Sequence, residues 1–195
     1  MKLYGSTTSP FVRRARVVAF EAGLVPEFVL TSTDAGTAAL RAIAPIRKVP
    51  VAEIDGRVLF DSRAIAEWIT TTRGWGRLAP PRDRFAELNH LNAVDAALES
   101  QIEVFYLERE GVDVRALPLA ERQRDRTRVI FAWLLAEHAA GRFGAELGFA
   151  ALSLRCALDW MRFRNRWPLA ELDAFEPIVG RFDAWESVRS TAPHV

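Results

Sequence analysis

The chain has 195 residues, of which 50% are apolar and 26% are charged, and its formal net charge is +1. This is the composition of an ordinary globular protein, so it excludes wholesale disorder, and a general binder of nucleic acid would be more basic. No stretch is apolar and long enough to span a membrane, and the amino terminus lacks the apolar core of a signal peptide. The single cysteine, Cys156, excludes an internal disulfide and suits a reducing compartment. We therefore expect a cytoplasmic protein that binds neither nucleic acid nor membranes.

Short β-like runs alternate with helical runs over residues 1–75. The clearest signal is Asp55-Gly56, a dipeptide typical of a type I′ hairpin turn, which lies between two extended runs. In chain order, the pattern predicts strands at 2–5, 26–31, 51–54 and 57–60, and helices at 11–22, 37–44 and 62–69.

The chain changes character after this region. Residues 74–81 are rich in glycine and proline and predict a linker. Apolar residues spaced three and four apart predict one long helix over 84–110, and another helix follows Pro118. In that second helix the stretch 129–135 is apolar on all sides, which predicts the centre of a helical bundle. Two further helices are expected, one from an N-cap at Ser153 to about Arg166 and one over 175–189.

A family resemblance follows from the order of these elements and from three motifs. The arrangement βαβ followed by ββα, with a Val-Pro-Val opening to the third strand, is thioredoxin-like. The motifs are Thr8-Ser9-Pro10-Phe11-Val12-Arg13-Arg14, Lys48-Val49-Pro50-Val51 and Asp61-Ser62. With an all-helical second half behind them, the chain resembles the cytosolic glutathione transferase family, of the bacterial serine type, over nearly its whole length. The resemblance implies a thioredoxin-like α/β domain over 1–75, a linker over 76–82 and an all-α bundle over 83–195.

Ser9 is the candidate catalytic residue. It precedes Pro10 at the start of the first predicted helix, where an ordinary N-cap role would by itself explain a serine. The resemblance implies that its hydroxyl donates a hydrogen bond to the glutathione thiolate. A free thiol has a pKa of about 8.5, so ionisation at neutral pH needs such a donor or a helix dipole. Thr8 and Ser6 are neighbouring hydroxyls that could substitute, whereas Tyr4 lies inside the predicted strand and is expected to pack.

The resemblance also implies a glutathione site. The backbone of Val49, before a cis Pro50, would pair with the cysteinyl part of the tripeptide. Asp61 and Ser62 open a helix that either of them could cap, and in the family this pair, more often Glu-Ser, binds the γ-glutamyl end. Lys48 is either solvated or pairs with the glycyl carboxylate.

The acceptor substrate is expected to bind in the helical half. The candidates are Phe11, Phe105 and Tyr106, although most aromatic residues on a long helix are core residues, and a buried Tyr106 would need a partner for its hydroxyl. Arg13 and Arg14 are expected to face solvent or an interface.

The remaining signals are structural. The family's penultimate core helix commonly begins with a Ser/Thr-x-x-Asp capping box, but here Ser153 is followed by Cys156 in place of the acid, and Cys156 is expected to be a small buried residue. The histidines are scattered without the spacing of a metal site, so no metal is expected. The basic run at 122–128 is interrupted by acids and predicts a solvated or dimer-facing helix.

The resemblance therefore predicts a homodimeric glutathione transferase of detoxification type, which conjugates the thiolate of its cosubstrate glutathione to small electrophilic apolar compounds. Two alternatives remain. One is another glutathione chemistry on the same scaffold, such as peroxide or disulfide reduction, isomerisation, dehalogenation or ether cleavage. The other is a non-catalytic, protein-binding member of the same fold, against which the joint presence of Ser9, Val49-Pro50 and Asp61-Ser62 argues.

Overall fold

The computed structural model describes all residues, 1–195. The chain divides into two compact units, which are described separately. Unit 1 comprises Met1–Pro80 together with Phe182–Val195, and unit 2 comprises Pro81–Arg181. Residues 182–195, which the sequence pattern assigns to the helical domain, thus group with the first unit.

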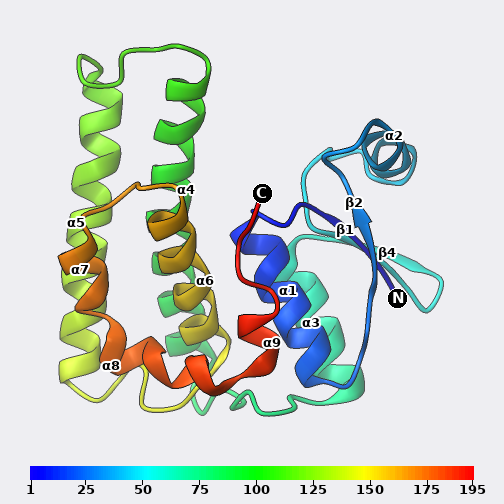
Figure 1. Cartoon of the computed structure of the whole chain (residues 1–195). Helices are drawn as coiled ribbons and strands as arrows, with labels where there is room; N and C mark the ends of the chain where they lie inside the picture. Colours follow the sequence, from blue (N-terminus) through cyan, green and yellow to red (C-terminus); the bar gives the residue numbers. More distant parts are fainter. The chain divides into compact units, whose positions relative to one another are not determined.

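Unit 1 is built on a mixed four-stranded sheet. The sheet has the order β2-β1-β3-β4, with β1 parallel to β2 and antiparallel to β3, and β3 antiparallel to β4. In Figure 1, α1 and α3 lie beside one another on one side of the sheet. The elements are β1 (Lys2–Gly5), α1 (Pro10–Glu21), β2 (Glu27–Leu30), α2 (Asp34–Ile43), β3 (Val51–Ile54), β4 (Arg57–Phe60), α3 (Ser62–Arg73) and α9 (Glu186–Arg189). The predicted thioredoxin-like arrangement, followed by a helical region, is confirmed.

The core of unit 1 forms where apolar residues of the strands meet one face of each helix. Leu3 of β1, Val51 of β3 and Ile65 of α3 are completely buried. The predicted hairpin turn is also confirmed, because Asp55 and Gly56 both have positive φ, 47° and 75°, as a type I′ turn requires.

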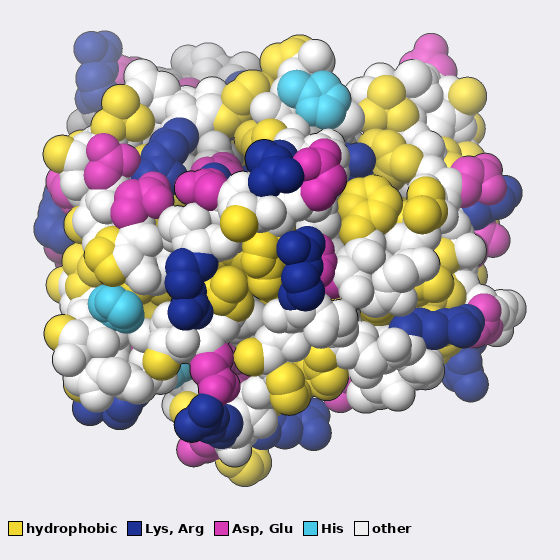
Figure 2. Space-filling view, turned by 60° about the horizontal axis from the view of Figure 1, so that its bottom comes forward, with side chains coloured by type: hydrophobic (Ala, Val, Ile, Leu, Met, Phe, Trp, Pro, Cys, Tyr) yellow, Lys and Arg dark blue, Asp and Glu magenta, His cyan; other side chains and the backbone are white.

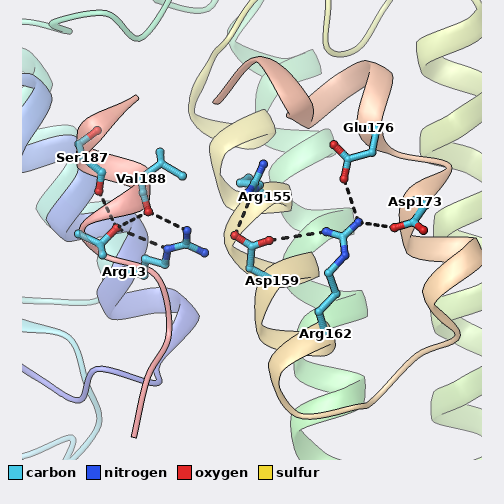
Figure 3. A network of polar contacts seen from close by, with 9 residues as sticks. Arg13, Arg155, Asp159, Arg162, Asp173, Glu176, Ser187 and Val188 are labelled. Atoms are coloured by element: carbon cyan, nitrogen blue, oxygen red, sulfur yellow. Dashed lines mark hydrogen bonds and ion pairs between the residues drawn. The ribbon is translucent and has the colours of Figure 1, made fainter. Parts of the chain in front are cut away.

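The carboxyl-terminal segment is tied to α1 by a buried arginine. Arg13 is 3% exposed, and its Nη2 donates to the carbonyl of Val188 at 3.0 Å (Figure 3). Its Nε lies 3.5 Å from the hydroxyl of Thr191. Arg13 was expected to face solvent or an interface, and it is instead buried against the carboxyl-terminal segment. The carbonyls at the end of α9 lack hydrogen-bond donors within that helix. The guanidinium of Arg13 is the donor for one of these carbonyls, that of Val188.

A second link in unit 1 uses a carboxylate at the end of α1. The side chain of Glu21 is 4% exposed and accepts two hydrogen bonds at 2.7 Å from the guanidinium of Arg77. It also accepts a hydrogen bond from the hydroxyl of Ser187 in α9. The last helix is therefore held to α1 by a polar contact as well as by packing.

Unit 2 is a helical bundle. Its long helix α4 packs against both α5 and α6, and α4 and α5 run side by side in Figure 1. The elements are α4 (Arg84–Arg109), α5 (Pro118–Ala139), α6 (Phe149–Phe163), α7 (Leu169–Asp173) and α8 (Glu176–Val179), and a 3-10 helix, η1 (Gly180–Ala184), crosses the boundary between the units. No helix has the length and apolar character that a membrane crossing demands.

The middle of α5 differs from the prediction. In the stretch 129–135, Phe131 and Leu134 are buried, but Val129 is 61% exposed and Trp133 is 39% exposed. One face of this helix packs in the bundle and the other faces outward, so the expectation of a helix buried on all sides is wrong.

The start of α6 also differs. The helix begins at Phe149 with Gly148 as its N-cap, and Ser153 lies buried inside it, where its hydroxyl donates to the Phe149 carbonyl at 2.8 Å. The predicted N-cap at Ser153 is therefore wrong. Because Gly148 has no side chain to cap the helix, Glu87 of α4 does so, and its carboxylate accepts a hydrogen bond from the Ala150 amide at 2.7 Å.

The predicted last helix over 175–189 is broken into α8, η1 and α9. Pro177 occupies the first turn of α8, where a proline starts a helix, and Trp185 is extended with φ −90° and ψ 120°. The short helix α7 was not predicted.

A network of charged side chains holds the short helices α7 and α8 to α6. Asp159 accepts from Arg155 at 2.8 Å and lies 3.6 Å from Arg162. The guanidinium of Arg162 in turn contacts Asp173 and Glu176, each at 2.9 Å (Figure 3). Cys156 on the same helix is buried, as expected.

The surface reflects the near-zero net charge. On the face drawn in Figure 2, basic and acidic side chains are interspersed with apolar ones. In the basic run at 122–128, Arg124 lies 3.7 Å from Glu121 and Arg128 lies 3.2 Å from Asp125.

Candidate functional site

The strand register brings three loops to one end of the sheet of unit 1. Tyr4 near the end of β1 pairs with Val51 at the start of β3, and Val51 pairs with Phe60 at the end of β4. The segment after β1, the segment before β3 and the segment after β4 therefore emerge at the same edge. These segments carry Ser9, Lys48-Val49-Pro50 and Asp61-Ser62, respectively.

Ser9 is the N-cap of α1, with Pro10 as the first helical residue. Its Oγ accepts a hydrogen bond from the Val12 amide at 3.3 Å. This bond uses a lone pair of the oxygen, and the hydroxyl proton has no acceptor in the chain. The capping role and the donor role therefore do not exclude each other. Ser9 can satisfy the helix and still donate to a group outside the chain.

Tyr4 does not have this freedom. It is 5% exposed and packs with Leu40, Ala44 and Val51, and its hydroxyl donates to the Glu53 carboxylate. That hydrogen bond and burial together raise the pKa of Tyr4 to about 12. The expectation that Tyr4 is a packing residue is confirmed.

The bond between Val49 and Pro50 is cis, as the resemblance implied. The β1–β3 ladder begins only at Val51, and neither the N–H nor the C=O of Val49 has a hydrogen-bond partner in the chain. The backbone N–H and C=O of Val49 are thus free to pair with another peptide. Lys48 and Arg47 before it are both exposed.

Asp61 is the N-cap of α3, which decides between the two capping candidates. Its Oδ1 accepts from the Arg63 amide at 2.7 Å, and its φ of 73° is unusual for a residue other than glycine. The amides of Ser62 and Ala64 in the first turn have no acceptor in the chain. Such free N–H groups at a helix start suit an anion.

Arg14, which was expected to face solvent or an interface, is instead buried beside the candidate site. It is 2% exposed, and its Nε donates to the buried hydroxyl of Ser62 at 3.0 Å. The guanidinium also lies 4.9 Å from the ring centre of Phe11. The signal that could have revealed it is helical spacing, because Arg14 lies three and four residues before the buried Val17 and Val18.

The acceptor candidates Phe105 and Tyr106 belong to unit 2. Phe105 makes an edge-to-face contact with Trp160, with ring centres 5.6 Å apart. Tyr106 is 54% exposed, so its hydroxyl can be satisfied by water. No group of three or more His, Cys, Asp or Glu side chains in the chain is arranged to hold a metal ion.

Comparisons with known proteins show what the chain is similar to. Residues 3–77 match the family model of the glutathione S-transferase N-terminal domain. Over 183 residues the chain is 29% identical to YibF, an uncharacterized GST-like protein of Escherichia coli K12, a match that covers 86% of this chain and 85% of YibF.

Solved structures extend the likeness to the helical half. A glutathione transferase family member from Pseudomonas fluorescens Pf-5 with bound glutathione has a TM-score of 0.81 and 26% identity, and the match covers 100% of this chain and 99% of that one. The same family member with bound S-(propanoic acid)-glutathione has a TM-score of 0.79 and 25% identity over 100% of this chain and 99% of that one. A glutathione S-transferase from Methylobacillus flagellatus KT with glutathione bound shares the fold, with a TM-score of 0.83 and 22% identity over 99% of each chain. The protein thus has a thioredoxin-like domain followed by a helical region, and over residues 3–77 it is similar to the glutathione S-transferase N-terminal domain.

Proposed function

We propose that the protein is a glutathione transferase that joins the sulfur of glutathione to a small electrophilic compound. The observation that carries the proposal is the register Tyr4–Val51–Phe60, which gathers the loops of Ser9, Val49 and Asp61 at one end of the sheet. The glutathione bound to the relative from Pseudomonas fluorescens supports it.

In this proposal Ser9 stabilises the thiolate. Its unused hydroxyl proton points to a donor role, and the amino-terminal end of the α1 dipole favours a negative charge nearby. Lowering the thiol pKa by two units corresponds to about 2.7 kcal/mol of preferential binding of the thiolate. A charge-assisted hydrogen bond and a helix dipole together are of that size.

The other residues hold the tripeptide. The free N–H and C=O of Val49, next to Pro50, pair with its cysteinyl backbone, and Lys48 pairs with its glycyl carboxylate. Ser62 and the free amides of α3 take the γ-glutamyl carboxylate, while Asp61 faces the ammonium group. Asp61 is one methylene shorter than the glutamate that is more common in the family.

We further propose that the acceptor binds in unit 2 near Phe105 and Tyr106, and that the protein is a cytoplasmic homodimer. The relative that binds S-(propanoic acid)-glutathione supports an S-conjugate as the product.

The test is glutathione binding by calorimetry near neutral pH, combined with thiolate absorbance near about 240 nm, a wavelength set by thiolate chemistry. We expect Ser9→Ala to bind glutathione without the thiolate signal and to lose conjugation activity. Ser9→Asp keeps an acceptor for the Val12 amide but has no proton to donate, so it should retain stability and lose the thiolate.

Ser32→Ala is the matched control, because Ser32 is exposed and lies outside the site. If Ser9→Ala keeps the thiolate, Thr8→Ala and Ser6→Ala identify the donor, and the role of Ser9 is wrong. If the wild-type protein does not bind even millimolar glutathione, the transferase proposal fails and the protein is a non-catalytic member of the fold.

A further inference from the structure

Three arginines converge on one phenyl ring in unit 2. The guanidinium carbons of Arg109, Arg164 and Arg166 lie 5.7, 5.2 and 5.7 Å from the ring centre of Phe105. All three groups are therefore within the distance at which a cation interacts with an aromatic ring face. Arg109 comes from the end of α4, and the other two follow α6.

Two of the three positive charges in this cluster have no carboxylate partner within the chain. Arg166 forms an ion pair with Glu108 and donates to the Arg164 carbonyl at 3.0 Å. Arg109 and Arg164 have no carboxylate partner. In addition, the Nε of Arg164 is buried and has no hydrogen-bond acceptor.

A buried donor without an acceptor is costly, and like charges gathered around one ring repel one another. Both costs fall if an anion binds there. A carboxylate suits guanidinium groups in particular, because its two oxygens match their planar donors.

The surroundings favour a flat apolar group next to that anion. Trp160 meets Phe105 edge to face, and Phe163 lies under the guanidinium of Arg164 at 4.7 Å. Tyr106 lies beside Phe105 with ring centres 5.6 Å apart and is 54% exposed, so one side of the cluster is open to solvent. The cluster thus combines aromatic walls with unpaired positive charge.

We propose that the acceptor substrates of this protein are aromatic electrophiles that carry a carboxylate, and that Arg109 and Arg164 select them. This inference rests on the proposed function. It narrows the acceptor from small electrophilic compounds in general to aromatic ones that carry a carboxylate. Arg166, whose charge is taken up by Glu108, positions Phe105 and Arg164.

A suitable probe is a chlorodinitrobenzoate with its chlorine para to the carboxylate, compared with its uncharged methyl ester. In the reaction the glutathione thiolate attacks the ring carbon that carries chlorine and forms the C–S bond. The C–Cl bond breaks, and chloride leaves with its electron pair. The thiol proton has already gone to solvent when the thiolate formed, so no oxidant or further reactant is needed.

The experiment measures kcat/KM for the acid and the ester, each divided by its uncatalysed rate with glutathione. We expect the wild-type protein to favour the acid about tenfold, the size of one charge-assisted hydrogen bond. Arg109→Gln and Arg164→Gln should each reduce this preference several-fold through KM, and Arg164→Lys should retain part of it. Higher ionic strength should also reduce it.

Arg128→Gln is the matched control, because it removes an exposed arginine of α5 that pairs with Asp125 and lies outside the cluster. It should leave the preference unchanged. Thermal unfolding of every variant separates loss of binding from loss of fold.

Equal use of acid and ester by the wild-type protein, or an unchanged preference in both glutamine variants, would overturn the inference. If neither compound is conjugated, the proposed function fails instead, and calorimetry decides the inference separately. In that case dinitrobenzoate should bind more tightly than its methyl ester, and should lose this advantage in Arg164→Gln; equal binding would contradict it.

Discussion

The two hydroxyls of Tyr4 and Ser9, near the end of β1, differ in whether they still have a proton to donate. The Tyr4 hydroxyl is committed to Glu53, whereas the Ser9 hydroxyl accepts from Val12 and keeps its proton. The difference arises from position, because Tyr4 points into the core of the sheet and Ser9 caps a helix. A tyrosine hydroxyl could in principle donate to a thiolate, but the hydroxyl of Tyr4 already donates to Glu53 and has no further proton.

Tyr4→Phe tests this distinction. The raised pKa means that the folded protein keeps the Tyr4 proton at pH values where the unfolded chain has lost it. The contribution is therefore complete below about pH 10, the unfolded value, and is lost as pH rises toward about 12. Tyr4→Phe should remove the ultraviolet titration step near pH 12, lower the free energy of unfolding at neutral pH by about 1 kcal/mol and leave glutathione conjugation unchanged. A large loss of conjugation at unchanged stability would return Tyr4 to the list of thiolate donors.

At the scale of elements, α6 depends on a carboxylate from another helix. Glu87 of α4 accepts a hydrogen bond from the Ala150 amide, because neither Gly148 nor Ala151 has a polar side-chain atom that could accept one in the first turn. Glu87→Ala should lower the free energy of unfolding by about 1–2 kcal/mol, as the loss of an N-cap does. Hydrogen exchange should show faster exchange in the first turn of α6. Glu99→Ala, which removes an exposed glutamate of the same helix α4, is the control, and equal effects of both variants would argue against the cap.

The elements of unit 1 could be predicted because short-range chemistry decides them. Asp55-Gly56 sets a turn that both residues can adopt, and Ser9 and Asp61 each occupy the N-cap of a helix. The start of α6 could not be predicted, because its cap comes from Glu87 in another helix. Ser153 is a residue type typical of an N-cap, but it lies inside the helix.

The candidate site divides in the same way. Its residues come from three short motifs, and within each motif they are contiguous in sequence. They could therefore be found without the structure. The hydrogen bond between Arg14 and Ser62, and the contact of Arg164 with Phe105, join segments far apart in the chain. Only the fold reveals contacts of this kind.

At the scale of the molecule, the stability of unit 1 is linked to pH through Glu21. Burial raises the pKa of this carboxyl, but hydrogen bonds from Arg77 and Ser187 outweigh burial and hold it below its usual value. A lowered pKa stabilises the fold above the unfolded value of about 4.3, and this contribution is lost as pH falls through the folded value.

Glu21→Gln should therefore flatten the decline in unfolding free energy between neutral pH and pH values below about 4. Urea unfolding at a series of pH values measures it. Glu110→Gln removes an exposed carboxylate of unit 2 and should leave the profile unchanged. An identical acid profile for Glu21→Gln and the wild-type protein would show that the contact contributes nothing to acid sensitivity.

The composition of unit 1 also constrains how the protein is made. Its core draws on Met1–Pro80 and on Phe182–Val195, so the ribosome delivers the first part early and the second part only after the whole of unit 2. Until then Arg13 lacks the Val188 carbonyl and Glu21 lacks the Ser187 hydroxyl. Unit 2, which lies wholly between them, can complete its fold while the nascent chain is still attached. A chain that ends just after unit 2 therefore lacks the residues that complete the contacts of Arg13 and Glu21 in unit 1.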